Sequence, residues 1–220
     1  MSTERFPDGF LRVFHRALAV TGWERRTATT WRRGDGETGP GYAEEVRLRR
    51  ERAAVGSDTW LLHAEYAGHV VEPVPGYPGR WRRGHRRALA RPLVYLHEAK
   101  GGEVAGWVIQ TADAYLAAAA WVVGEILPRV AALTLPPPWE AGSDYGWNRF
   151  WTCGPPEGHL AAATLHVGGL DAPGLTLRAR ATSGRFGERE WPLPVGAGTP
   201  ALDAALAEVL ALLAAVLADP

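Results

Sequence analysis

The sequence has almost no cysteine, methionine or lysine, since each occurs once among 220 residues. A single cysteine, Cys153, excludes a disulfide within the chain, so we expect a cytoplasmic protein. The one lysine, Lys100, stands against 23 arginines, a skew typical of bacterial genomes that are rich in G and C. Some of these arginines are therefore expected to serve solubility, as lysine does elsewhere.

Long apolar runs and catalytic signatures are also missing. The longest apolar stretch, Ala114–Leu127, is interrupted by Glu125 and followed by Pro128. It is too short for a membrane span and predicts a buried helix. The first residues show no basic segment before an apolar core, so we expect no secretory signal. No G-x-S-x-G, phosphate loop or helix-opening G-x-G-x-x-G is present. We therefore expect binding rather than catalysis, and no cofactor.

The chain as a whole has no net charge, but each half of it does. Residues 1–100 hold 18 Arg and Lys against 12 Asp and Glu, and the remaining 120 residues hold 6 against 12. The halves therefore carry +6 and −6. Either the two halves attract each other, or the basic half meets an anionic partner.

Helical spacing of apolar residues appears in three places. Residues 8–21 form an amphipathic pattern that Asp8 can cap and Gly22 can end. Residues 112–133 are apolar nearly all round, with a kink expected at Pro128. Residues 199–218 begin with Thr199-Pro200, a cap followed by proline at the first helical position.

Alternation of apolar and polar residues predicts an antiparallel sheet. In residues 59–71, Leu62, Ala64 and Tyr66 share one face, and His63 and Glu65 share the other. Further strands are expected in these segments: 23–33, 43–55, 93–98, 104–110, 147–153, 159–167 and 175–182. The fold class is therefore α+β, a mainly antiparallel sheet with three helices.

The proline-rich segment Leu135–Gly142 is the best candidate for a boundary. It divides the chain into a basic α+β lobe, 1–134, and an acidic β-meander with a terminal helix, 135–220. Strands followed by an apolar helix occur in both halves, but no repeat of fixed period is visible. We expect one continuous domain or two tightly packed lobes.

The segment 79–92 is the strongest candidate for a binding site. Prolines lead into it, and a helix here would stack like charges at a spacing of four, so we expect a loop. Arginine binds phosphate with two hydrogen bonds and stacks on bases, and Trp81 adds a ring for stacking. The predicted anion-binding residues are Arg80, Trp81, Arg82, Arg83, His85, Arg86, Arg87 and Arg91.

An acidic partner, most plausibly nucleic acid, would relieve the repulsion within this segment. Arg26, Arg32, Arg47 and Arg49 extend the surface if their strands expose the same face. Two other interpretations stay open: a solvated loop, or one that pairs with the acidic half. No zinc-finger, RNP or KH motif accompanies the arginines.

A protein–protein module is the alternative function, an adaptor, chaperone or immunity-type subunit. The terminal helix carries few charges and must be covered on most sides, either within the fold or by another protein, including a second copy.

Aromatic rings beside carboxylates indicate a third possibility, a small-ligand pocket. Flat rings can stack on a sugar or a cation, and paired carboxylates are also used in glycoside hydrolysis. Packing of these rings in a core is the simpler interpretation. The residues are Trp139, Glu140, Asp144, Tyr145, Trp147 and Trp151.

Two weaker candidates remain. His63, Glu65 and His97 lie on expected strands and could gather around a metal, although no metal site is predicted. Cys153 precedes His159 and His166, but lone cysteines are more often small buried hydrophobes.

Overall fold

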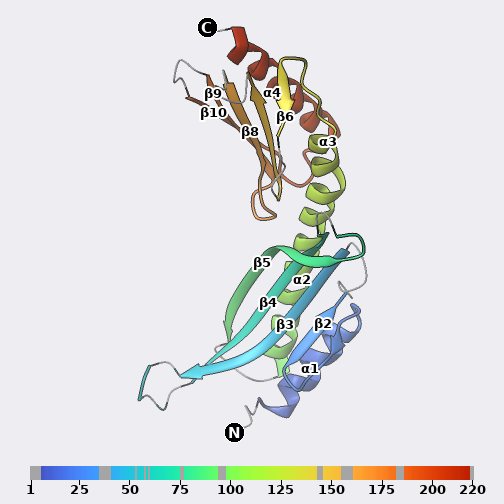
Figure 1. Cartoon of the computed structure of the whole chain (residues 1–220). Coiled ribbons are helices and arrows are strands. Elements are labelled where there is room, and N and C mark those ends of the chain that lie inside the picture. The colour runs from blue at the N-terminus through green and yellow to red at the C-terminus, as the bar shows by residue number, and fades with distance from the viewer. Residues whose placement is uncertain are drawn as a thin grey trace. The chain divides into compact units, whose positions relative to one another are not determined.

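The computed structural model describes residues 6–34, 41–52, 54–56, 58, 60–74, 77–93, 98–142, 146–154, 161–181 and 186–218. The chain divides into two compact units, Met1–Leu116 and Ala117–Pro220. Each contains a five-stranded antiparallel sheet, and helices accompany both sheets (Figure 1). The α+β prediction is therefore confirmed. The domain boundary predicted between residues 134 and 135 stays a prediction.

The first unit is a meander in which each strand pairs with the next along the chain. Its order is β1-β2-β3-β4-β5, so β5 lies at an edge and pairs only with β4. The bounds are β1 (Glu24–Arg25), β2 (Thr30–Arg33), β3 (Gly41–Arg52), β4 (Trp60–Pro73) and β5 (Trp81–Leu93). The expected strands in 23–33, 43–55 and 59–71 are confirmed.

Helix α1 (Asp8–Ala19) and the first part of α2 (Glu98–Trp121) cover one face of this sheet (Figure 1). On α1, Phe10, Phe14 and Leu18 are fully buried, as their helical spacing predicts. The Phe14 ring meets the Trp31 ring of β2 edge to face at 5.0 Å between centroids. From α2, Tyr115 packs in the same way against Tyr66 of β4 at 6.1 Å.

The central helix is longer than the sequence predicts. Helix α2 starts at Glu98 and continues through a π-helical turn, η1 (Val122–Ile126), into α3 (Leu127–Ala131). The π turn precedes Pro128, where a kink is expected. The strand predicted over 104–110 is wrong, because this stretch is part of α2. Val104, Val108 and Ala112 are buried at a spacing of four, which is helical.

The second unit repeats the plan of the first, a five-stranded meander followed by a long helix. Its sheet order is β10-β9-β8-β7-β6. The elements are β6 (Trp139–Ala141), β7 (Asn148–Cys153), β8 (Ala161–Val167), β9 (Gly174–Ala181), β10 (Phe186–Pro192) and α4 (Gly198–Ala218). The strands expected in 147–153, 159–167 and 175–182 and the helix expected over 199–218 are confirmed. Of the strand predicted over 93–98, residues 94–97 lie outside the described part.

Within the part of the chain that the structure describes, two helical stretches are long and apolar enough to cross a membrane. They are Lys100–Ala131 and Gly198–Val216, with mean hydropathy 1.3 and 1.7. Core helices of soluble proteins pass the same test, and Ala105, Ala112, Tyr115 and Ala119 of the first stretch are buried. The chain is therefore not clearly a membrane protein.

Candidate nucleic-acid interface

The face of the first sheet opposite α1 and α2 carries charged side chains on every strand. Residues on this face alternate with the buried ones, so Glu45, Arg47 and Arg49 of β3 lie opposite the core side of Val46 and Leu48. Pairing across the strands brings Arg32 of β2 and Glu65 of β4 to the same side. We call this surface the arginine face and define it by Arg26, Arg32, Arg47, Arg49, Arg83 and Arg86.

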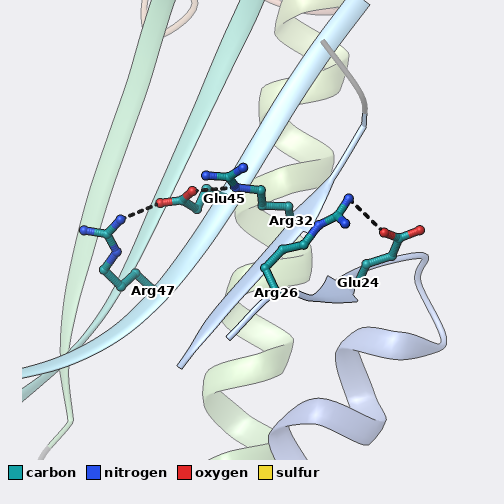
Figure 2. A network of polar contacts seen from close by, with 5 residues as sticks. All are labelled: Glu24, Arg26, Arg32, Glu45 and Arg47. Carbon is teal, nitrogen blue, oxygen red and sulfur yellow. Dashed lines mark hydrogen bonds and ion pairs between the residues drawn. The ribbon is translucent and has the colours of Figure 1, made fainter. Parts of the chain in front are cut away.

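Glutamates hold four of these six arginines in ion pairs. Glu45 lies between Arg32 and Arg47 and binds them at 2.8 Å and 3.0 Å, while Arg26 binds Glu24 at 3.0 Å (Figure 2). Arg49 pairs with Glu65. These contacts are exposed and contribute little to stability, on the order of 0–1 kcal/mol each. Their effect is to fix the guanidinium groups in place and to offset part of their charge.

A β-bulge places Arg83 and Arg86 together on this face. His69 is paired with Arg86 and Val71 with Arg83, so two β5 residues, Gly84 and His85, lie opposite the single β4 residue between. In a regular strand, residues three apart point to opposite faces, and the additional residue corrects this. Both arginines therefore share the side of His69.

Arg83 and Arg86 are the part of the arginine face whose charge is not offset. Both side chains are exposed, and among the described residues neither has a carboxylate within ion-pair distance. Burial lowers the pKa of the His69 imidazole, and the charges of Arg83 and Arg86 lower it further, whereas Glu45 acts in the opposite sense. Arg83 and Arg86 therefore lie close enough to His69 to disfavour its charged form.

A hollow of about 550 Å³ lies beside these groups. Its wall is formed by side chains and backbone from four strands and from the turn between β1 and β2. The residues are Arg26, Thr27, Thr30, Arg32, Gly34, Ala43, Glu44, Glu45, Arg47, His69 and Arg83. A second hollow of about 420 Å³ continues the surface past Arg47, Arg49 and Arg86. The arginine face is thus a shallow depression in the sheet in which arginines outnumber carboxylates.

The segment predicted as a loop is a strand, and this part of the prediction is wrong. Residues 81–93 form β5, because the prolines that argue against a strand lie before it or, in the case of Pro92, on the edge strand where proline is tolerated. Strand geometry then distributes the predicted residues over both sides of the sheet.

The other predicted anion-binding residues, apart from Trp81, do not belong to the arginine face. Arg80 lies in the turn before β5 with its guanidinium 5.4 Å from the Tyr77 ring centroid. Arg82 binds Glu72 at 3.4 Å. Arg87 and Arg91 are paired with Gly68 and Ala64, whose neighbours on that side are core residues. Trp81 lies on the side of Arg83 but is half-buried and lines neither hollow, and His85 is half-buried.

A buried ion pair beneath the sheet keeps β2, β3 and β4 in register. The Glu44 carboxylate is 4% exposed and accepts hydrogen bonds from Arg33 Nε at 2.7 Å and from Tyr66 Oη at 2.8 Å. Burial and the charge of Glu44 raise the pKa of both Tyr66 and Tyr115 above the usual range, so both stay protonated. Neither the ion pair nor the bulge was anticipated from the sequence. The one sign of the ion pair in the sequence is Glu44, an acidic residue on the side of β3 that also carries Val46 and Leu48.

The predicted ligand-pocket residues lie in the second unit. Trp139 and Trp151 are buried, 6% and 2% exposed, and belong to the core side of its sheet. Glu140 is exposed and Trp147 is half-buried, while Asp144 and Tyr145 lie outside the described residues. A small-ligand pocket here stays a prediction.

The histidine and cysteine candidates are not brought together in the described part of the chain. His63 binds Glu51 at 3.2 Å, Glu65 binds Arg49, and His97 lies outside the described residues. Cys153 is buried. His159 is outside the described residues, and His166 contacts Asn148. Among described residues, no group of three His, Cys, Asp or Glu side chains is arranged to hold a metal ion.

Comparison with protein-family models, with curated proteins and with solved structures gave no match for this chain.

Proposed function

We propose that this protein binds nucleic acid without acting on it chemically, and that the arginine face contacts the phosphate backbone. The observation that carries the proposal is the pair Arg83 and Arg86, which the bulge brings to one side of His69 without a carboxylate partner among the described residues. Guanidinium groups bind phosphate oxygens with two hydrogen bonds, and such contacts supply most of the non-specific affinity for nucleic acid.

The chemistry of the face favours backbone contacts over stacking on bases. Among the residues that line the two hollows, Tyr66 is the only Trp, Tyr or Phe. Its ring lies on the buried side of the sheet and is not accessible to a base. Proteins that hold single strands by stacking present aromatic rings on the binding surface. We therefore expect little preference among base sequences, and a cytoplasmic location fits such a partner.

The first test is a titration with labelled single-stranded DNA, duplex DNA and RNA at several salt concentrations. Each phosphate contact releases counterions, so the logarithm of the binding constant falls with the logarithm of salt concentration by about 0.7–0.9 per contact. The double variant Arg83→Ala/Arg86→Ala should bind more weakly and with a slope less steep by about 1.5. Arg180→Ala, at an exposed strand position in the second unit, is the matched control.

Absence of binding at low salt would refute the proposal. So would equal binding by the wild type and the Arg83→Ala/Arg86→Ala variant, provided that both have the same circular dichroism spectrum.

A protein partner is the second candidate, favoured by helix α4. Its exposed positions include Ala204, Ala207, Ala211 and Ala214, and only 28% of its most apolar window is buried within the chain. Under this hypothesis a dimer or a complex with another protein persists at high salt, because apolar contacts are not screened. Sedimentation in low and high salt separates the two functions.

A further inference from the structure

We propose that Arg83, His69 and Arg86 form a binding site for a phosphate monoester, the group found at the phosphorylated end of a nucleic acid and in free inorganic phosphate. This inference rests on the proposed function for its biological ligand, but the site has its own geometry and can be tested separately.

The geometry comes from the bulge. His69 lies on β4 directly opposite Arg86, and Arg83 faces the next β4 residue on the same side, Val71. The imidazole is therefore flanked by two guanidinium groups from the neighbouring strand. His69 and Arg83 line the larger hollow and Arg86 lines the smaller one, so the three groups are reached from open surface. Gly84 lies within the bulge, where a Cβ would overlap the Glu72 carboxylate.

The number of charges selects the ligand. A phosphodiester carries one negative charge, whereas a monoester carries about −1.5 to −2 near pH 7. Two guanidinium groups without carboxylate partners in the described chain match a dianion better than a diester. The other arginines of the hollow are less available, because Glu45 already binds both Arg32 and Arg47.

Histidine adds a dependence on pH. The groups that act on His69 are Arg83 and Arg86 from β5, which disfavour its proton, and Glu45 from β3, which favours it. On its own strand, Glu65 is paired with Arg49. A bound dianion offsets the two arginines and favours the imidazolium, which then donates a further hydrogen bond to the ligand. Binding of an anion that stays doubly charged, such as sulfate, is therefore accompanied by proton uptake and strengthens as the pH falls through the histidine range.

The experiment compares one oligonucleotide with a 5′-phosphate and with a 5′-hydroxyl, and adds inorganic phosphate and sulfate as free anions. Affinity is measured on the full chain at constant ionic strength, at about pH 5.5 and about pH 8, on either side of the ordinary histidine pKa. Sulfate keeps both charges throughout this range, so any change in its affinity reports on the protein alone. The His69 imidazole is followed by NMR.

We expect the phosphorylated oligonucleotide to bind about tenfold more tightly, the effect of one charge-assisted hydrogen bond. Arg83→Ala and Arg86→Ala should each remove this preference, and Arg180→Ala should keep it. Sulfate should bind about threefold or more tightly at the lower pH, and His69→Gln should abolish that difference.

The outcomes separate the two proposals. Oligonucleotide binding that ignores the terminal phosphate, with no shift of the His69 resonances by phosphate, overturns the monoester site and leaves the proposed function intact. A phosphate-induced shift of His69 that Arg83→Ala abolishes supports the site even if no oligonucleotide binds. Absence of both oligonucleotide binding and the phosphate-induced shift of His69 overturns both proposals.

Discussion

Gly68 of β4 lies against two buried tyrosines and has no room for a side chain. A Cβ there would lie 2.7 Å from Tyr66 Oη and 2.8 Å from the Tyr115 ring. Both rings are fully buried and cannot move aside. We expect Gly68→Ala to lower the free energy of unfolding by about 1–3 kcal/mol, the usual cost of overpacking. Denaturant unfolding measures the change.

Gly106 provides the control for this substitution. It is exposed on α2, and a Cβ would meet nothing within 4 Å. Gly106→Ala should be neutral or stabilise by up to about 1 kcal/mol, because alanine favours a helix over glycine. Equal effects of the two substitutions would contradict the packing described around Gly68.

Glu44 and Glu45 are neighbours in sequence with opposite surroundings. Glu44→Gln leaves the Arg33 guanidinium, whose side chain is 19% exposed, without its charged partner. Losing one member of such a pair costs about 3 kcal/mol. Glu45→Gln, on the exposed side, should cost about 1 kcal/mol or less. Unfolding of the two variants in urea tests the difference, and a larger effect at Glu45 would contradict the assignment of faces.

His69 should make stability depend on pH even without a ligand. Its pKa in the folded chain is lowered from the ordinary value of 6.5, so the unfolded chain binds the proton more readily. The free energy of unfolding therefore falls as the pH drops below about 6.5 and is unaffected above it. His69→Gln should remove this contribution. Thermal unfolding between about pH 5 and about pH 8 tests the effect, and a rise in stability on acidification that depends on His69 would contradict it.

Strand β5 is the element on which the proposals depend. The structure has an additional residue at Gly84-His85 that sets which side Arg83 takes. Deleting His85 should restore regular alternation. Gly84 then lies opposite Val70, so Arg83 and Arg86 are two positions apart and both stay on the side of His69. We expect the deletion variant to keep its affinity for phosphate within about threefold of the wild type, whereas Arg83→Ala should lose about tenfold. Isothermal titration compares the two variants.

The control for the deletion is the fold itself. Amide exchange in β3 and β4 should resemble that of the wild type, because these strands pair with each other along their whole length. A folded deletion variant that loses as much phosphate affinity as Arg83→Ala would contradict the register described for β4 and β5.

Edge strands also need protection from pairing with other chains, and charged residues and proline at an edge are common means. Arg82, Arg86 and Pro92 of β5 meet this need whatever else they bind. Removal of several arginines at once therefore has two effects, and light scattering should accompany every binding measurement on such variants.

The elements that the sequence predicted are those whose pattern is local. Phe10, Phe14 and Leu18 recur at helical spacing, and Leu175, Leu177 and Ala179 alternate on β9, so each pattern identifies its buried side. The strand prediction for 104–110 was wrong because Val and Ile favour strands. The residues that are buried there recur at a spacing of four, and the stretch is helical. Strand β10 was missed because Glu188, Arg189 and Glu190 give it no apolar alternation.

The candidate site could be predicted only in part. Exposure of Arg32, Arg47 and Arg49 on one side follows from alternation, provided that their strands expose the same face. The meeting of Arg83 and Arg86 depends on how β5 pairs with β4, which is a property of two strands and not of one. No spacing rule applied to residues 79–92 alone can reveal it.

At the scale of the whole molecule, the two units have the same order of strands and helix, but the two halves of the sequence differ in the sign of their net charge. The arginine face belongs to the first unit, and the second half of the sequence has an excess of six acidic residues. We expect nucleic acid to protect amides of β3, β4 and β5 from hydrogen exchange and to leave α4 and β7–β9 unchanged. Exchange followed by mass spectrometry tests this, and protection restricted to α4 would favour the protein-partner hypothesis instead.

Lys100 is the only side-chain amine in the sequence, and it lies at the start of α2, where Glu103 binds it at 2.6 Å. The adjacent Gly101 packs against Phe10 of α1, on the helical side of the sheet. Acetylation, ubiquitination and amine-reactive dyes can thus reach this one side chain but none on the arginine face. Modification of lysine therefore cannot remove positive charge from that face. A fluorophore on Lys100 can report on binding without altering the arginine face.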